Sequence, residues 1–152
     1  MNYISSIFVT LFYIGKSPIA PGTLGSIVGI LIWACLNYYL GLIGFIIFFI
    51  VYFIVSYILV NIYINKTKQD DPSEVICDEV IGQFIPLLII GSINEYYLII
   101  FSFILFRFFD IYKIYPVNKA EKLHGAFGVI LDDVVAGIYA LIFLFIIKYS
   151  IY

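Results

Sequence analysis

Long apolar runs separated by short polar segments make up most of the chain. Runs of this length predict helices over about residues 24–40, 45–64, 73–90 and 96–111, and a last helix from about 123 to 147. Gly41 and Gly44 separate the first two runs, and Pro72 precedes the third. Because about 20 apolar residues cross a bilayer, the pattern predicts an all-α fold. We expect a small helical bundle, integral to a membrane, with about four to five membrane-embedded helices.

Residues 1–14 form a shorter apolar run at the start of the chain. They lack a basic n-region, and Pro21 after Ala20 spoils the nearby small-residue cleavage site, so we expect a mature segment rather than a signal peptide. A run of about a dozen residues is short for a span. The sequence therefore predicts a short N-terminal helix that lies at the membrane interface or is partly inserted.

The composition separates the chain from soluble domains. Hydrophobic residues make up 64% of its 152 residues and charged residues 12%, against about 45–50% and 25% in soluble domains. The length predicts one domain over residues 1–152. A net charge of −2 gives no sign of nucleic-acid binding. Cys35 and Cys77 form neither a disulfide framework nor a zinc motif, and homo-oligomer formation stays open.

Threading the predicted helices through a bilayer brings the polar motifs to one side. The first two spans return the chain to its starting side, and so do the next two. The cationic residues on that side are Lys16, Lys66, Lys68, Arg107, Lys113, Lys119 and Lys122. Only Lys148 falls on the other side, so the positive-inside rule predicts that the polar side faces the cytoplasm.

Two adjacent carboxylates, Asp132 and Asp133, interrupt the last apolar run. One charge inside a hydrocarbon-embedded helix costs roughly 2.5 to 3.5 kcal/mol, and two like charges cost more unless a cation lies between them. Small residues four positions away, Gly128, Ala136 and Gly137, allow other helices to approach these acids. The alternative is that one Asp caps a helix while its neighbour faces water.

A second acidic pair, Asp78 and Glu79, lies near the start of the predicted helix 73–90. Gly82 and Gln83 follow these acids at a spacing of four, so the arrangement resembles that of the other pair. A metal site and a helix start favoured by the helix dipole both explain it.

A third charged group ends the predicted helix 96–111. Arg107 and Asp110 share one helix face, and Lys113 follows on the same sector if the helix continues. The alternative is an internal salt bridge at the membrane interface.

The segment 15–26 contains two prolines and three glycines and opens the first long helix, with Thr23 as a helix cap. Free N–H groups at this helix start, with the hydroxyls of Thr23 and Ser26, predict a binding site for an anion such as phosphate. Gly25 and Gly29 also form a GxxxG pair. Its simpler explanation is close helix packing, which is compatible with anion binding.

Together these groups predict a phosphate-processing metal site at the membrane surface. Oxygen ligands without a His/Cys set favour a hard cation such as Mg²⁺, with Asp78, Glu79, Asp132 and Asp133 as its ligands. These four acids and Asp110 are also the candidate catalytic carboxylates, and the identity of the general base stays open. One or two ions would polarise the phosphoryl group and ready a water for in-line attack.

The candidate phosphate-binding residues are Arg107, Lys113, Thr23, Ser26 and His124. Arg107 and Lys113 would neutralise the charge that develops on the phosphate. His124 could also protonate the leaving alkoxide, although a lone loop histidine is more often a hydrogen-bonding or interfacial residue.

Four blocks of the sequence resemble the phosphatidylglycerophosphatase A family: SPIAPGTLGS, VICDEVIG, FRFFDIYK and HGAFGVILDDVVAG. The resemblance spans about residues 17–140, and the blocks are specific as a set although each alone is weak. It implies an integral, multi-pass protein of the bacterial inner membrane, with a phospholipid as its substrate. The implied activity is Mg²⁺-dependent hydrolysis of phosphatidylglycerophosphate to phosphatidylglycerol and phosphate.

The resemblance also implies roles for individual residues. It matches Thr23 and Ser26 to the family's glycine-threonine loop, Asp78 and Glu79 to its DE block, Arg107, Asp110 and Lys113 to its FRxxDxxK block, and Asp132 and Asp133 to its DD block. Two positions depart from the family pattern. Ile114 replaces the usual proline after the lysine, and Ala126 replaces a frequent second glycine after the histidine.

Three other classes of protein compete with this hypothesis. A small ion transporter or channel subunit is the main alternative, because intramembrane acids with a basic partner also mark ion paths. It would place its acids at mid-bilayer depth, whereas here each lies within a few turns of a predicted helix end. A lipid-transferring synthase of the CDP-alcohol class would carry a DGxxAR...GxxxDxxxD pattern, which the chain lacks. A structural scaffold would keep its function after loss of Asp78 or Asp132.

Overall fold

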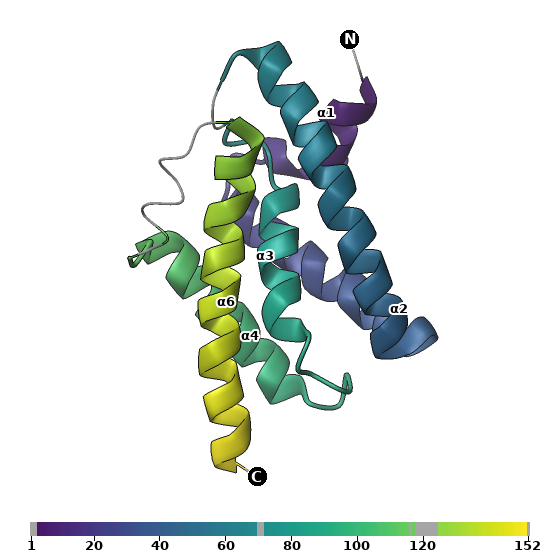
Figure 1. Ribbon diagram of the computed structural model, residues 1–152, viewed down its shortest axis with the longest axis vertical. Coiled ribbons are helices and arrows are strands. Elements are labelled where there is room, and N and C mark those ends of the chain that lie inside the picture. Colours follow the sequence, from purple (N-terminus) through teal and green to yellow (C-terminus); the bar gives the residue numbers. More distant parts are fainter. Residues whose placement is uncertain (1–2, 70–71, 116, 118–124, 152) are drawn as a thin grey trace.

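Helices account for the regular structure in the described part of the chain, which comprises residues 3–69, 72–115, 117 and 125–151 of the computed structural model (Figure 1). The elements are α1 (Tyr3–Val9), the short 3₁₀ helix η1 (Ile14–Lys16), α2 (Pro21–Thr67), α3 (Cys77–Leu87), α4 (Tyr96–Tyr112) and α6 (Gly125–Ile151). No strand occurs among these residues. The predicted all-α fold class and the short N-terminal helix are confirmed.

α2 is a helical hairpin, because its backbone leaves the helical region at Gly41 (φ 67°, ψ −171°). Figure 1 shows the reversal: the first arm, residues 21–40, runs down to the lower right, and the second arm, residues 42–67, runs back up. A positive φ is strained for a residue with a Cβ, which is why glycine occupies this turn. The predicted break at Gly41 is confirmed.

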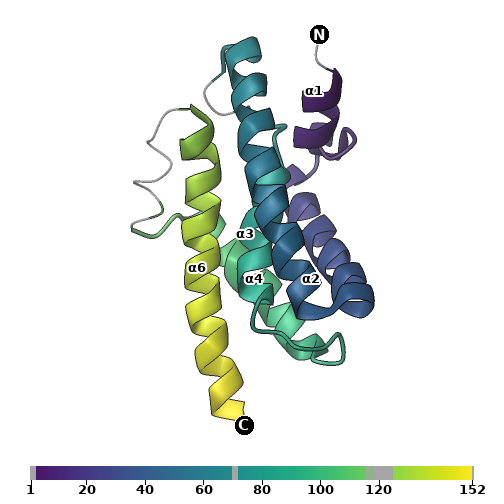
Figure 2. The ribbon, with the colours of Figure 1, turned by 45° about the vertical axis from the view of Figure 1, so that its right-hand side comes forward.

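α3 is the central helix of the bundle. It lies between α6 and the second arm of α2 in both views (Figures 1 and 2). It is shorter than the predicted helix 73–90, because the chain before Cys77 is held by other bonds: the Ile76 N–H donates to the Val9 carbonyl oxygen at 2.9 Å. At its other end α3 stops at Leu87, one residue after Pro86. The missing N–H of Pro86 leaves the Gly82 carbonyl without its helical hydrogen bond, which weakens this last turn.

The second arm of α2 packs on α3 through aromatic side chains. The ring of Phe84 on α3 lies 5.2 Å from that of Phe45 and 5.7 Å from those of Phe49 and Tyr52, between ring centroids. These edge-to-face contacts are a favourable geometry for aromatic pairs. The apolar composition of residues 45–64 suggests a purely lipid-facing anchor, but this interpretation is wrong, since one face of this arm is buried in the bundle.

Two glycines let α3 approach α6 and α4 closely. A Cβ atom on Gly137 of α6 would overlap the carbonyl oxygen of Gly82 on α3, and a Cβ on Gly82 would overlap the ring of Phe106 on α4. The predicted close approach of helices beside the acidic pairs is confirmed at these two positions. Asp78 and Asp133 are brought near each other by this packing.

The loop between α3 and α4 is tied to the end of α6. The Glu95 carboxylate accepts hydrogen bonds from the N–H groups of Gly91 (3.0 Å) and Ser92 (3.1 Å), and it pairs with Lys148 Nζ at 3.1 Å. Lys148 also donates to the Ile89 carbonyl oxygen at 2.7 Å. In Figure 1 this end of the bundle lies at the bottom, near the C-terminus, away from the start of α6.

Two helices of the described chain are long and apolar enough to cross a membrane: Pro21–Thr67 and Gly125–Ser150. Many large apolar side chains on them are exposed, such as Ile43 (75%) and Ile146 (56%), as expected for surfaces that lipid covers. The predicted number of membrane-embedded helices, four to five, stays a prediction, and so does the interfacial placement of residues 1–14.

Candidate functional site

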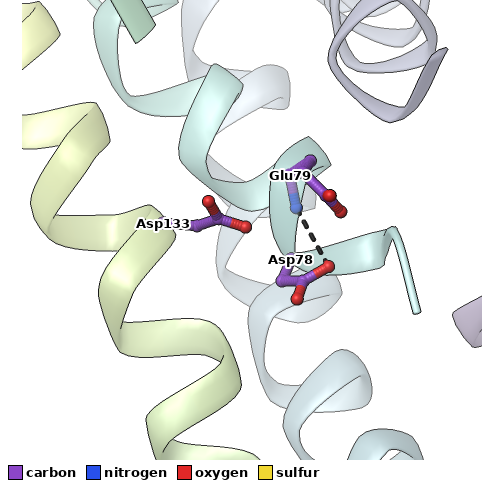
Figure 3. A group of neighbouring side chains, drawn as sticks. All are labelled: Asp78, Glu79 and Asp133. Carbon is purple, nitrogen blue, oxygen red and sulfur yellow. Dashed lines mark hydrogen bonds between the residues drawn. The ribbon is translucent and has the colours of Figure 1, made fainter. Parts of the chain in front are cut away.

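Three carboxylates meet in the interior of the bundle. One oxygen each from Asp78, Glu79 and Asp133 lies within 4.8 Å of the other two. Asp78 and Glu79 come from the first turn of α3, and Asp133 points from α6 toward that turn (Figure 3). Asp78 is 6% exposed and Asp133 4%. We call these three residues the carboxylate cluster.

Local bonds fix the first turn of α3. Asp78 Oδ1 accepts the N–H of Glu79 at 3.1 Å, which satisfies one of the N–H groups left free at a helix start. The positive end of the helix dipole also favours negative side chains here. These effects explain two acids at the start of α3, but they do not explain why a third acid comes from α6.

The cluster is electrostatically unfavourable without a cation. Burial raises the pKa of Asp78 well above its ordinary value, and the charges of Glu79 and Asp133 raise it further. Burial also raises the pKa of Glu79 to about 7, although a hydrogen bond with Asp78 and the charge of Arg107 act in the opposite direction. Like charges held together in a low dielectric repel strongly. A positive ion would relieve this repulsion.

The donor set fits a hard divalent cation. Three carboxylates supply oxygen ligands, and Glu79 Oε2 is buried without a hydrogen-bond partner among the described residues. A buried carboxylate oxygen without a donor is costly, and a cation bound to this oxygen would offset that cost. Mg²⁺ is bound in proteins by a few carboxylates, with waters and phosphate oxygens completing its octahedron. Asp78, Glu79 and Asp133 could therefore hold such an ion.

Arg107 lies beside the cluster, at the point where α4 meets the start of α2. Its Nη1 pairs with Asp110 Oδ2 at 2.5 Å, while its Nε is buried without a hydrogen-bond partner in the described part of the chain. A Cβ atom on Gly22 would lie 3.0 Å from Arg107 Nη1 and 2.5 Å from Glu79 Oε1. The guanidinium, the cluster and the first turn of α2 therefore adjoin one another.

Asp132 and Lys113 form a second charged group. Lys113 Nζ lies 3.2 Å from Asp132 Oδ2. Lys113 follows the last residue of α4 with a left-handed backbone (φ 44°), so the helix does not continue through it. The condition under which Lys113 would share the sector of Arg107 and Asp110 is therefore not met. Asp132 is not part of the carboxylate cluster, because neighbours on a helix point about 100° apart. Its role as a metal ligand stays a prediction.

The start of α2 differs from the predicted arrangement. The residue before the helix is Ala20, in a left-handed conformation (φ 44°), and Pro21 follows it, so the expected helix cap at Thr23 is wrong. Proline fits the first helical position because its fixed φ suits a helix and its missing N–H is not needed there. Ser26 is fully buried and donates to the Gly22 carbonyl oxygen at 3.1 Å.

The phosphate-binding roles assigned to Thr23 and Ser26 stay predictions. His124 lies outside the described residues, and so do Lys119 and Lys122. Ala126, one of the two departures from the family pattern, is buried in the second position of α6, while Ile114 is exposed after α4.

One residue at the site was not predicted from the sequence. Gly22 adjoins both Glu79 and Arg107, and only its place in the PGTLGS motif hinted at a role.

Comparisons with known proteins give relatives of similar length. A protein of Bacteroides thetaiotaomicron named putative phosphatidylinositol-3-phosphatase is 35% identical, over 99% of this chain and 97% of its own. A phosphatidylglycerophosphatase A of Haemophilus influenzae is 39% identical over 86% of this chain and 80% of its own. The Escherichia coli protein of the same name is 30% identical, covering 82% and 72%. No solved structure matches the chain.

The family comparison covers nearly the whole sequence. The model of the family described as phosphatidylglycerophosphatase A matches residues 7–148, which include all four motif blocks and every member of the carboxylate cluster. Together with the relatives of that name, this match shows that the chain belongs to the phosphatidylglycerophosphatase A family.

Proposed function

We propose that this protein hydrolyses the phosphate monoester of phosphatidylglycerophosphate, giving phosphatidylglycerol and inorganic phosphate with the help of Mg²⁺. Family membership and the names of the relatives support a lipid phosphatase. One observation of the structure carries the proposal: three buried carboxylates from two helices lie within 4.8 Å of one another, beside an arginine. Family membership favours the phosphatase over the ion-transporter and scaffold alternatives.

Asp78, Glu79 and Asp133 would hold the ion in the proposed site. When bound, Mg²⁺ would neutralise these carboxylates and polarise the phosphoryl oxygens of the substrate. Helix packing fixes the Asp78 and Asp133 side chains before substrate arrives, since both are almost completely buried. Such preorganisation avoids the cost of arranging charges during the reaction.

The cationic side chains would bind the phosphate. Arg107 is held by Asp110 and Lys113 by Asp132, so an acid orients each of the two cations. In the reaction, the oxygen of a water forms a bond to phosphorus and the bond from phosphorus to the glycerol oxygen breaks. A carboxylate of the site accepts the proton of the water, and the glycerol oxygen takes up a proton as it leaves.

A lipid substrate fits the surroundings of the site. The two helices that can cross a membrane carry exposed apolar side chains and flank the cluster. A phospholipid in the bilayer could therefore keep its acyl chains in the membrane while its phosphate reaches the polar end of the bundle. We further propose a multi-pass protein of the bacterial inner membrane with this end facing the cytoplasm, on the basis of the lysine distribution.

One relative suggests a different lipid. The protein of Bacteroides thetaiotaomicron, whose alignment covers almost the whole of both chains, is named putative phosphatidylinositol-3-phosphatase. A phosphatidylinositol 3-phosphate substrate would present the same monoester on a bulkier headgroup. The cluster and the two cations suit either phosphate, so this activity is the second candidate.

A phosphate-release assay tests both candidates. Purified protein in detergent micelles receives either phosphatidylglycerophosphate or phosphatidylinositol 3-phosphate with Mg²⁺, and the initial rates are compared. We expect faster release from phosphatidylglycerophosphate, loss of activity with EDTA and recovery with excess Mg²⁺. The chelator result checks the metal, because a divalent ion is the only component of the mixture that EDTA removes.

Two results would contradict the proposal. Phosphate release that continues unchanged in EDTA, after dialysis, would exclude the metal-assisted mechanism. Absence of release from either lipid with any divalent ion would refute the phosphatase, and ion flux in liposomes made with the same preparation would then support the transporter.

A further inference from the structure

An apolar groove lies between the second arm of α2 and the start of α6. Its volume is about 350 Å³, and it is lined by Phe53, Tyr57, Phe127, Ile130, Leu131 and Val134. Ile130 is buried, whereas Phe53, Tyr57 and Phe127 are exposed, so the groove is open at the surface of the bundle. We call it the α2–α6 groove. The function described above assigns no role to it.

The spacing of the lining residues explains how the groove forms. Phe53 and Tyr57 are four residues apart on α2, and Phe127 and Val134 are seven apart on α6, so each pair lies on one face of its helix. Both helices are long and apolar enough to cross a membrane. In a membrane-embedded protein the groove therefore opens to the acyl chains of the bilayer.

The α2–α6 groove is continuous with the candidate site along α6. Leu131 directly precedes Asp132, and Val134 directly follows Asp133. Since successive helical residues point about 100° apart, the α6 side chains of the groove lie roughly 60–160° from Asp133 in one direction around the helix, and Asp132 lies about 100° in the other. Asp132 pairs with Lys113. Asp133 thus lies between the groove on one side of α6 and the ammonium group of Lys113 on the other.

We propose that the α2–α6 groove binds one acyl chain of the phospholipid whose phosphate monoester reaches the carboxylate cluster. The inference rests on the proposed function. A phospholipid carries its anionic phosphate and its apolar chains on one glycerol, so a site for it combines cations with an adjoining apolar surface. Arg107 and Lys113 supply the cations, and the groove supplies the apolar surface beside Asp133.

The groove acts on the position of the substrate more than on its partition. Lipid chains are as apolar as the side chains of the groove, so a chain gains little free energy by leaving the bilayer for the groove. A chain held there instead restricts the monoester to one position over the cluster. Reactions in which the reacting groups are held in place gain large rate factors.

A single acyl chain fits the size of the groove better than a helix of another protein does. One turn of an α-helix, about 5.4 Å long and 10–12 Å wide with its side chains, occupies roughly 400–600 Å³. This exceeds the 350 Å³ of the groove. An unbranched hydrocarbon chain is narrower and can lie along it.

Photolabelling of the wild-type protein tests the inference without turnover. Protein in phosphatidylcholine nanodiscs with Mg²⁺ receives one of two probes that carry the same diazirine-bearing acyl chain. The first is the phosphonate analogue of phosphatidylglycerophosphate, in which a methylene group replaces the ester oxygen so that it is not hydrolysed. The second is phosphatidylcholine. Mass spectrometry then maps the labelled residues.

A second groove on α6 is the internal control for the labelling. It lies at the opposite end of the helix, has a volume of about 300 Å³, and is lined by Ile89, Leu141, Ile142, Phe145 and Ile146. We expect the phosphonate probe to label the α2–α6 groove about fivefold more strongly than the phosphatidylcholine probe does. Both probes should label the control groove equally, because it has no phosphate site beside it.

Substitution of Leu131 by Trp tests the effect on turnover. The larger side chain narrows the groove without a change of charge, so kcat/KM for long-chain phosphatidylglycerophosphate should fall about tenfold. For a short-chain, water-soluble form of the same lipid kcat/KM should be unchanged, because its chains do not extend along the groove. Ile142→Trp narrows the control groove and should change neither value.

Several outcomes would overturn the inference. Equal labelling of the α2–α6 groove by the two probes would do so, and a groove labelled by neither probe would indicate that another helix or a second copy of the chain covers it. An equal fall of kcat/KM for both lipids in Leu131→Trp would mean that the substitution disturbs the neighbouring Asp132 instead.

The labelling separates this inference from the proposed function. If the wild-type protein released no phosphate from either lipid, the phosphatase would be refuted, while selective labelling would still establish a groove for a phosphate-bearing lipid. Phosphate release without selective labelling would refute the groove alone.

Discussion

Neighbouring acids in this sequence have different partners in space. Asp133 joins Asp78 and Glu79, while Asp132 pairs with Lys113. The reason is the helix itself, in which successive side chains point about 100° apart. At the scale of single residues, the two aspartates should therefore affect different properties of the enzyme.

Substitution of Asp133 by Asn should remove a metal ligand. We expect kcat to fall about 100-fold or more, and Mg²⁺ affinity to fall with it. In EDTA the variant should melt at a higher temperature than the wild type, since a buried charge next to two like charges is gone. Calorimetric titration, phosphate release and a melting curve measure the three effects.

Asp132→Asn and Glu74→Gln serve as comparisons for that variant. Asp132→Asn should mainly raise KM, because it frees Lys113 from its acid, and Glu74→Gln should change neither constant, because Glu74 is a partly exposed partner of Lys16. If Asp132→Asn reduced Mg²⁺ affinity as much as Asp133→Asn, the original prediction that Asp132 ligates the metal would be correct.

Gly22 is required for its size. A Cβ atom at this position would lie 2.5 Å from Glu79 Oε1 and 3.0 Å from Arg107 Nη1, so Gly22→Ala should displace both groups and reduce kcat/KM at least tenfold. Gly29→Ala in the same arm is the matched control, because its Cβ would meet Gln83 at an ordinary 3.4 Å. Equal activity of the two variants would show that the start of α2 does not adjoin the reacting groups.

At the scale of elements, α3 is held in position by packing against its neighbours, because it is too short to span a membrane by itself. Eleven residues span about 16 Å, which is half of a hydrocarbon core of about 30 Å. The helix is stable because nearly all its side chains are buried against α2, α4 and α6. Its first turn carries two acids of the cluster, and the loop after its last turn is tied to α6.

That tie should contribute stability without affecting activity. Lys148 of α6 pairs with Glu95 at 3.1 Å and donates to the Ile89 carbonyl oxygen at 2.7 Å, with 26% and 18% of the two charged side chains exposed. Lys148→Met should lower stability by about 1 kcal/mol, or about 2–4 °C in melting temperature. The specific activity of Lys148→Met should be unchanged. Lys66→Met is the control, because Lys66 is exposed. Its specific activity and its melting temperature should both stay at the wild-type values. A loss of activity in Lys148→Met would mean that the two ends of the bundle are coupled.

At the scale of the whole molecule, the hairpin of α2 determines which segments share a side. Both ends of α2 lie toward the end of the bundle that holds the cluster, whereas the turn between its two arms lies at the opposite end (Figures 1 and 2). The same end receives the start of α3 and the start of α6. The predicted threading through a bilayer agrees with this arrangement, and its direction is testable.

Sided labelling of cysteines measures that direction. In a Cys35→Ser background, Lys68→Cys should react with a membrane-impermeant maleimide only in inside-out vesicles, and Tyr39→Cys only in intact cells from which the outer membrane has been removed. Lys68 and Tyr39 are both exposed, while the remaining Cys77 is buried. Labelling of both positions from one side would contradict a hairpin that crosses the membrane.

Much of the fold could be predicted because local rules determine it. The glycine break at Gly41 and the start of α4 after the turn 91–95 were predicted to within about a residue, since they depend on backbone preferences that the local sequence carries. The start of α3 was misplaced by several residues, because the bond from Ile76 to Val9 joins segments far apart in the chain. The buried face of the second arm of α2 was missed for the same reason. The sequence of an apolar helix that faces lipid resembles that of an apolar helix that faces protein.

The sequence by itself determined the helical class, the family and the set of charged residues, because hydrophobic periodicity and motif order are properties of the chain alone. Only the tertiary structure decided which charges meet. It placed Asp133 with Asp78 and Glu79, and it paired Asp132 with Lys113. The physical reason is that these contacts depend on the rotation of each helix about its axis, which the packing of Gly82 against Gly137 and of Phe84 against α2 determines.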